Sequence, residues 1–449
     1  MAEDEITTSA TSESDLASFA AMIDEAEVPM PVDADLARRR RRRRRVGWIA
    51  ALVVVLLFAA AGGYAAYTLN APIALPAAAT RTPPPTAGAP VALALPSEGA
   101  SSIDVQGAAD FLGANGLTAA SGSADPQPMA SISKLVTALV VLDAHPLAGP
   151  DDAGPTLTFS KADHDLYDAF YVEGATIEEM PTGSTMSLHD ALELMLVASA
   201  SNYAQAVAVW AFGSESAFLH AADDWMARNG LTQTTLDEPT GIDARNTSTP
   251  ADLLTLGKLA LANPAVAAIV AKPQLDVPGF SGSNTNTLLG TDGVRGIKTG
   301  TLDHSNLLYS SLLDVGIGAP LQVTGVILGG ADHASVDADV QALLSSIRGG
   351  FHRVPLATKG QSFGSYTTAW GAEGSLVLAD DASLLTWSDT PITATVVTTP
   401  LKTGSAGEEV GTVTWTDGPH TVSAALVLDR DIALPDAWWR LTHPFELGG

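Results

Sequence analysis

Apolar residues along the chain form runs of different structural kinds. Residues 46–69 carry no charge, and at about 1.5 Å rise per residue a helix of this length crosses a ~30 Å hydrocarbon core. Residues 129–143 are almost entirely apolar, which predicts a helix buried on all sides. From 188 to 196 the apolar positions have the spacing of an amphipathic helix, and Ser187 and Asp190 stand where a capping box begins it.

The second half of the chain changes its pattern. We expect helices at 216–229, 250–261 and 264–271, and strands at 292–301, 307–313 and 322–328. After about residue 354, short alternating segments rich in Thr, Val and Trp replace any helical period, which predicts a small all-β domain.

These patterns divide the 449 residues into five parts. The two folded parts are a large α/β domain and the β domain, and the 46% hydrophobic residues supply ample core material for both. The predicted parts are a disordered acidic cytoplasmic tail ending in an arginine run (1–45), a transmembrane helix (46–69), a Pro/Ala-rich extended linker (70–97), the α/β domain (98–352) and the β domain (353–449).

The charges beside the apolar span predict its orientation across the membrane. Eight consecutive arginines, Arg38 to Arg45, precede it, and such a run keeps its side of a span in the cytoplasm. Trp48 lies near one end, and Tyr64 and Tyr67 near the other, as is typical of interfacial rings. We therefore expect a single-pass plasma-membrane anchor with an outward-facing bulk. A cleaved signal remains an alternative, because three alanines at 77–79 would suit a signal peptidase.

Composition excludes several kinds of chemistry. The formal net charge of −27 makes a nucleic-acid partner implausible. Cysteine is absent, which removes disulfides and thiolate catalysis. No zinc-binding spacing occurs, so Asp332, His333, Asp337 and Asp339 are interpreted as a solvated helix start, and neither metal nor cofactor is expected. Residues 360–364 match Gly-x-Ser-x-Gly, but β-like residues follow where that motif needs a helix.

The buried helix carries a pair of reactive groups. Ser131 and Lys134 stand at i and i+3, so their side chains share one face. Burial lowers a lysine's pKa, which makes a neutral amine available to take the serine proton. By itself this spacing is equally consistent with a serine cap and a lysine reaching outward.

Two later motifs favour the catalytic interpretation. Ser199 lies at a polar break between two apolar helices, and Lys298-Thr299-Gly300-Thr301 lies on a predicted strand. With Ser131 and Lys134 they form an ordered set that resembles the three signatures of low-molecular-weight penicillin-binding proteins, the serine-type D-alanyl-D-alanine carboxypeptidases. The matching stretches are Pro128-Met-Ala-Ser-Ile-Ser-Lys-Leu-Val-Thr-Ala-Leu139, Leu196-Val-Ala-Ser-Ala-Ser-Asn-Tyr-Ala204 and Gly293-Val-Arg-Gly-Ile-Lys-Thr-Gly-Thr301.

The resemblance covers about residues 100–350 and implies a fold and a mechanism. The fold is a β-lactamase-like antiparallel sheet with helices on both sides. In the implied reaction Ser131 is the nucleophile, Lys134 the general base and Ser199 a proton relay. Lys298 and Thr299 would bind the terminal carboxylate of the substrate, and the amides of Ser131 and Thr301 would form the oxyanion hole. Gly300 would let the substrate backbone approach the strand.

The second motif departs from the family's Ser-x-Asn. It reads Ser199-Ala-Ser201, with Asn202 one position late. In this register, which we favour, Ser201 replaces the asparagine and Asn202 turns away from the site. The alternative register, Ala200-Ser201-Asn202, keeps the asparagine and loses the first serine. Both Ser201 and Asn202 are therefore candidate substrate-binding residues.

The predicted function is removal of the terminal D-alanine from peptidoglycan stems ending in D-Ala-D-Ala, with β-lactams as inhibitors that acylate Ser131. Competing functions on the same scaffold are a D,D-endopeptidase and a β-lactamase. A catalytically weakened wall-binding protein is the competing non-enzymatic function. The sequence leaves the oligomeric state open.

Overall fold

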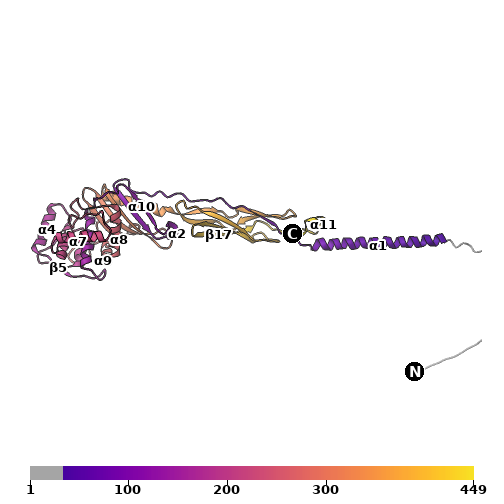
Figure 1. Ribbon diagram of the computed structural model, residues 1–449, viewed down its shortest axis with the longest axis horizontal. Coiled ribbons are helices and arrows are strands. Elements are labelled where there is room, and N and C mark those ends of the chain that lie inside the picture. The colour runs from indigo at the N-terminus through magenta and orange to yellow at the C-terminus, as the bar shows by residue number, and fades with distance from the viewer. Residues whose placement is uncertain (1–33, 449) are drawn as a thin grey trace, which may run out of the picture. The chain divides into compact units, whose positions relative to one another are not determined.

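The computed structural model describes residues 34–448, which form two compact units. One unit combines the N-terminal helix with residues 368–372 and the C-terminal segment from Ala433 onward. The other holds residues 76–367 and 373–432. The elements of both are drawn in Figure 1.

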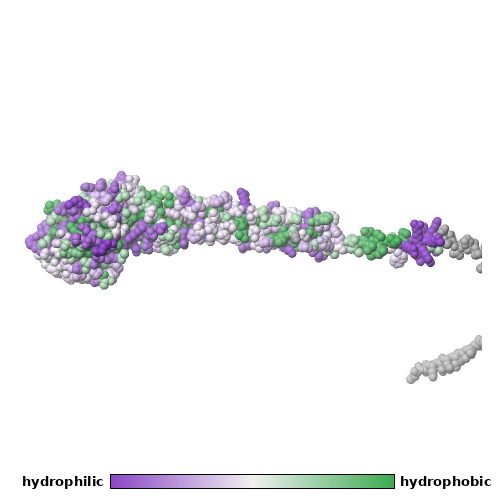
Figure 2. All heavy atoms as spheres, viewed as in Figure 1, coloured by the Kyte–Doolittle hydropathy of each residue, from purple (hydrophilic) through white to green (hydrophobic). Residues whose placement is uncertain are grey.

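The first unit is built on a single long helix, α1 (Ala34–Asn70). Its portion Ala37–Asn70 is long and apolar enough to cross a membrane, and the predicted span 46–69 lies within it. The arginine run forms a polar surface next to this apolar stretch (Figure 2). Arg38 to Arg45, expected in a disordered tail, continue the helix, because arginine is a good helix former and extending an existing helix costs little. The rest of that predicted tail, residues 1–33, lies outside the described residues.

The C-terminal segment packs against the end of α1. Helix α11 (Ala437–Thr442) and the 3-10 turn η3 (Pro444–Glu446) lie in the part of the chain assigned to the predicted all-β domain. Arg440 donates hydrogen bonds to the carbonyls of Leu69 and Ala71, at 3.2 and 2.9 Å. These carbonyls lie at or just past the helix end and lack intrahelical partners, so the guanidinium acts as a cap.

A five-stranded antiparallel sheet organises the larger unit. Helix α8 (Pro250–Ala262) packs on one face and α10 (His333–Gly350) on the other (Figure 1), which confirms the predicted sheet with helices on both sides. Side chains of neighbouring residues in a strand point to opposite faces of the sheet. The buried residues of these strands therefore alternate between the core on the α8 side and the core on the α10 side. The strand order is β3 (Leu117–Ser121), β2 (Ala100–Gln106), β10 (Leu321–Gly330), β9 (Ser305–Leu313) and β8 (Val294–Thr301).

A cluster of helices shares the core under one face of this sheet. Ten of the twelve residues of α3 (Ser133–Ala144) are buried, as the near absence of a polar face predicts. Helix α3 contacts α5, α6, α7 and α8. The other helices here are α5 (Leu188–Leu196), α6 (Ser201–Phe212), α7 (Glu215–Arg228), α9 (Pro264–Val270) and the peripheral α4 (Lys161–Val172). The short helix α2 (Ala109–Leu112) packs instead against the core on the other face of the sheet.

Residues 351–428 form the predicted β-rich region. Strands β11 (Phe351–Ala357) and β14 (Ala382–Trp387) pair with each other. A six-stranded sheet has the order β1-β12-β13-β17-β16-β15. Its edge strand β1 comes from the segment predicted as a linker, which adds to the sheet by pairing with β12. The bounds are β1 (Ala77–Thr80), β12 (Ser362–Thr367), β13 (Glu373–Leu378), β15 (Thr393–Thr398), β16 (Glu409–Asp417) and β17 (His420–Leu428).

Candidate active site

Ser131 lies in the 3-10 turn η1 (Ala130–Ile132), which leads directly into α3. The preceding Ala130 has a φ of 52°, a left-handed conformation that costs an L-residue about 1–2 kcal/mol. Two glycines allow neighbouring segments to pack on this turn. A Cβ at Gly241, whose φ is 86°, would overlap the Ala130 carbonyl, and one at Gly300 would lie 2.7 Å from the Met129 carbonyl oxygen. Ser131 is therefore presented by a strained turn held from two sides.

The amine of Lys134 lies in hydrogen-bond contact with the serine hydroxyl. The Nζ to Ser131 Oγ distance is 2.8 Å, and Nζ also donates to the Thr240 carbonyl at 2.8 Å. Lys134 is completely buried. Burial lowers the pKa of Lys134 from 10.5 to about 7, against the opposing attraction of the Glu238 carboxylate. Near neutral pH a large fraction of this amine is therefore uncharged and able to accept a proton.

The loop that carries Thr240 is held in shape by Glu238 and Asn246. The Glu238 carboxylate accepts from the backbone amides of Thr240 and Gly241, each at 2.6 Å. Asn246 is fully buried, and its amide nitrogen donates to Glu238 Oε1 at 2.9 Å and to Ser133 Oγ at 3.2 Å. This network connects the loop to α3 and holds the Thr240 carbonyl against Lys134. The sequence prediction did not include Glu238 or Asn246.

Strand β8 contacts η1 and brings the third motif to the same place. Lys298 is buried, and its Nζ donates to the Thr299 carbonyl at 3.2 Å. The pKa of Lys298 lies well below 10.5, first because the ammonium is desolvated and second because Lys134 repels it. The structure thus brings together the serine and both lysines predicted to converge.

The threonines of the third motif contact polar groups that the sequence prediction missed. Thr299 Oγ1 forms a hydrogen bond with Thr285 Oγ1. Thr301 is exposed, and its hydroxyl lies 2.7 Å from Nε2 of His333 at the start of α10. The sequence places His333 at a solvated helix start, and α10 does begin there. Nothing in a linear sequence shows that this helix begins beside the end of β8.

The second motif lies between α5 and α6. Ser199 has a φ of 64° and is 5% exposed. Among the described residues its hydroxyl forms no hydrogen bond, so it can still contact a ligand. Ser201 begins α6 and is also buried, and its backbone amide donates to the Thr176 carbonyl at 2.8 Å.

Asn202 has a different set of contacts. It is completely buried, and both polar atoms of its side chain bind the backbone of Glu178. Its Oδ1 accepts from the Glu178 amide at 3.1 Å, and its Nδ2 donates to the Glu178 carbonyl at 2.7 Å. Because this pairing occupies the amide, we leave Asn202 out of the proposed substrate site.

The arrangement suits nucleophilic chemistry. A hydroxyl in contact with a buried amine of lowered pKa is an activated nucleophile, and a second buried lysine is placed to attract an anion. Within residues 34–448, no three metal-binding side chains are grouped so that they could hold an ion.

Residues 116–311 match the family described as D-alanyl-D-alanine carboxypeptidase. The predicted resemblance to this family is confirmed. All nine predicted site residues of the carboxypeptidase-like region, from Ser131 to Thr301, fall inside the matched stretch.

Two curated relatives share part of this carboxypeptidase-like region. A D-alanyl-D-alanine endopeptidase of Pseudomonas aeruginosa is 31% identical over 193 residues, which are 42% of this chain and 55% of the relative. A D-alanyl-D-alanine endopeptidase of Escherichia coli is 34% identical over 131 residues, 29% of this chain and 38% of the relative. The chain therefore spans about half the length of the first relative and less of the second.

Among solved structures, penicillin binding protein 5 from Haemophilus influenzae is 17% identical. That comparison covers 75% of this chain and 98% of the other, with a TM-score of 0.48.

Proposed function

We propose that this chain is a serine D,D-carboxypeptidase that removes the terminal D-alanine of peptidoglycan stem peptides. The observation that carries the proposal is the 2.8 Å contact between Ser131 Oγ and the buried amine of Lys134. This contact pairs a nucleophile with its base, and the family match supplies the substrate class.

In the proposed reaction, neutral Lys134 takes the proton of Ser131 while Oγ bonds to the carbonyl carbon of the penultimate D-alanine. The oxyanion accepts hydrogen bonds from the backbone amides of Ser131 and Thr301. The carbon–nitrogen bond then breaks, and Ser199 relays the proton from Lys134 to the departing D-alanine amine. Water attacks the acyl ester, releases the shortened stem and restores the Ser131 hydroxyl.

Lys298 and Thr299 bind the terminal carboxylate in this proposal. Burial and the nearby Lys134 lower the pKa of Lys298, which disfavours its charged form. A carboxylate entering the pocket offsets that desolvation, so binding of substrate restores the ammonium form and a charge-assisted hydrogen bond. The space beside Gly300, expected to admit the substrate backbone, is filled by the turn that carries Ser131, so Gly300 acts by letting β8 approach that turn. Ser201 offers a hydroxyl in place of the motif asparagine.

We also propose that α1 is an uncleaved anchor with its arginine end in the cytoplasm. The apolar part of α1 suits a bilayer, and a block of arginines on one side of a span orients it with that side inward. The catalytic region then faces the cell wall, where D-Ala-D-Ala stems are found. A β-lactam imitates the acyl-D-alanyl-D-alanine group and would acylate Ser131.

Endopeptidase activity is the second candidate, because both curated relatives are named D-alanyl-D-alanine endopeptidases. The attack by Ser131 is unchanged in that reaction. Only the leaving nitrogen differs, since it belongs to the side chain of a neighbouring stem rather than to a free D-alanine.

The test is to incubate the full-length protein with a pentapeptide ending in D-Ala-D-Ala and, separately, with cross-linked muropeptide dimers. We expect D-alanine release by the wild type and by the control Ser123→Ala, which changes an exposed serine outside the site, and none by Ser131→Ala. Cleavage of dimers alone would favour the endopeptidase. Failure of the wild type on both substrates would overturn the proposal.

A further inference from the structure

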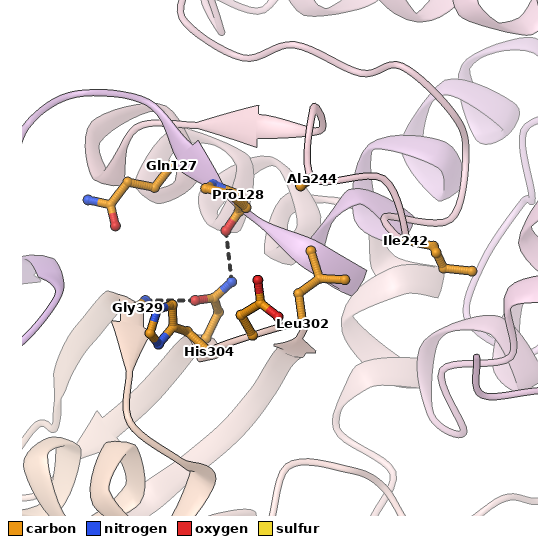
Figure 3. A pocket seen from close by; sticks show the side chains of 9 residues that line it. Gln127, Pro128, Ile242, Ala244, Leu302, His304 and Gly329 are labelled. Atoms are coloured by element: carbon orange, nitrogen blue, oxygen red, sulfur yellow. Dashed lines mark hydrogen bonds between the residues drawn. The ribbon is translucent and has the colours of Figure 1, made fainter. Parts of the chain in front are cut away.

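A cavity of about 320 Å³ lies beside the proposed active site (Figure 3). Three chain segments that also build that site enclose it. Gln127 and Pro128 shortly precede Ser131, and Ile242 and Ala244 follow Thr240 in the loop that contacts Lys134. Residues 302–304 connect β8 to β9. These shared segments place the cavity next to the catalytic region.

The direction of β8 indicates which part of a substrate reaches the cavity. Thr299, proposed to bind the terminal carboxylate, is followed by Gly300, which packs against the turn that carries Ser131. The cavity-lining Leu302 and Asp303 come next along the chain. With about 3.3 Å per residue along a strand, a stem peptide lying beside β8 with its carboxylate at Thr299 and its scissile carbonyl at Ser131 places the residue before the two D-alanines near the cavity.

The cavity wall has an apolar side and a polar side. In Figure 3, Leu302 and Ile242 lie toward one side, and Gln127 and His304 toward the other. Among the described residues, the side chains of Asp303, His304 and Gln127 form no hydrogen bond or ion pair, so their polar groups are available to a ligand.

The side chain of Asn306 bonds to the protein backbone and stabilises the cavity wall, so its polar atoms are not assigned to a ligand. Its Nδ2 donates to the Pro128 carbonyl at 3.0 Å, and its Oδ1 accepts from the Gly329 amide at 2.8 Å (Figure 3). These bonds connect the segment before Ser131 to the end of β10.

We propose that this cavity is a subsite for the side chain of the diamino acid that precedes D-Ala-D-Ala in the stem. The inference rests on the proposed function and names the part of the substrate that the cavity recognises. Leu302 and Ile242 pack on the aliphatic part of that side chain, and the Asp303 carboxylate pairs with its terminal ammonium.

The experiment compares two tripeptides of sequence Lys-D-Ala-D-Ala, both acylated at the α-amine. In one the side-chain amine of the lysine is free, and in the other it is acetylated. Acetylation removes the charge and leaves the reacting bond unchanged. We expect kcat/KM of the wild-type full-length protein to favour the free amine by about threefold to tenfold, the range of a partly exposed ion pair. A parallel assay uses a stem that carries diaminopimelate in place of lysine. The ratio of the two kcat/KM values shows which of the two side chains the cavity prefers.

Asp303→Asn should abolish this preference by lowering kcat/KM for the free-amine peptide. Asp151→Asn is the matched control, because it removes the same charge from an exposed loop residue outside the cavity. It should keep the preference. An equal kcat/KM for both peptides in the wild type, or an unchanged preference in Asp303→Asn, would overturn the subsite.

A binding measurement separates this inference from the proposed reaction. In a Ser131→Ala background, where no turnover is expected, the dissociation constants of the two peptides should show the same preference, again dependent on Asp303. A wild type that binds the free-amine peptide selectively without releasing D-alanine would refute the carboxypeptidase and retain the subsite. Unselective binding of the two peptides together with intact D-alanine release would refute the subsite and retain the carboxypeptidase.

Discussion

At the scale of single residues, the account depends on the burial of one amine. Lys134 has no exposed surface and a pKa of about 7, whereas an exposed lysine near pH 7 would be almost fully charged and could not act as a base. Glu238 works in the opposite direction by favouring the ammonium form. The balance leaves a base suited to neutral pH.

Acylation by penicillin should therefore depend on pH. The rate constant should rise as the pH increases through about 7, because the neutral, proton-accepting form of Lys134 replaces the ammonium form, and it should level off about one to two pH units higher. Measuring the rate constant of penicillin labelling at a series of pH values across this range gives the profile. Lys134→Arg, which stays protonated, should lower the rate by about 10²–10⁴ and lose the inflection. A wild-type profile that falls across the same interval would contradict the assignment of Lys134 as base.

Asn202 should prove structural. Removing a buried amide that satisfies both backbone groups of Glu178 leaves those groups unpaired, so Asn202→Ala should lower the free energy of unfolding by about 1–3 kcal/mol. Chemical denaturation measures this loss. Penicillin acylation per folded molecule should remain near the wild-type rate, whereas Ser199→Ala should slow it. A large fall in acylation by folded Asn202→Ala would return this residue to the substrate site.

At the scale of elements, the site exists because β8 contacts the turn at the head of α3. Gly300 makes that contact possible, since a Cβ there would lie 2.7 Å from the Met129 carbonyl oxygen and 3.3 Å from the Ser131 amide nitrogen. The strand carries Lys298 and the turn carries Ser131, so their separation sets the geometry of the pocket.

Gly300→Ala should push β8 away from η1 and reduce penicillin acylation at least about tenfold, because a shift of about 1 Å in reacting groups can cost a factor of 10². Gly149→Ala is the control, since an added Cβ there meets no atom within 4 Å and its φ is ordinary. Circular dichroism should show both variants folded. Unchanged acylation by Gly300→Ala would mean that this close contact does not determine the pocket.

The sequence predicted most of the candidate site because its residues lie in short motifs, in which the spacing along the chain indicates which side chains lie together. Ser131 and Lys134 share one helical face, and the Lys298 motif is a strand signature. Glu238, Thr285 and His333 could not be found in the same way, because each acts through a contact that only the tertiary fold creates. The helical course of Arg38 to Arg45, the strand in the predicted linker and the C-terminal α11 were missed because neighbouring elements override a weak local preference.

At the scale of the whole molecule, the C-terminal segment meets the end of α1. The α1 end is capped by Arg440, and the Tyr64 hydroxyl donates to the Leu441 carbonyl at 2.5 Å. Trp370 and Trp439 pack edge to face beside them. This unit ties the last residues to the outer end of the proposed membrane anchor.

Arg440→Ala should loosen that end. With the Leu69 and Ala71 carbonyls uncapped, the helix terminus loses about 0.5–1 kcal/mol, and limited proteolysis should cut near residues 70–75 several times faster. Arg430→Ala, which removes an exposed arginine paired with the adjacent Asp429, should leave that cleavage rate unchanged. Equal rates in the two variants would show that the cap does not stabilise this unit.

The most direct test of the central claim is intact-mass and peptide-level mass spectrometry of the full-length protein after treatment with penicillin. We expect one covalent adduct carrying the mass of one penicillin, located on the peptide that contains Ser131 and absent from Ser131→Ala. No adduct on the wild type, or an adduct on another residue, would contradict it.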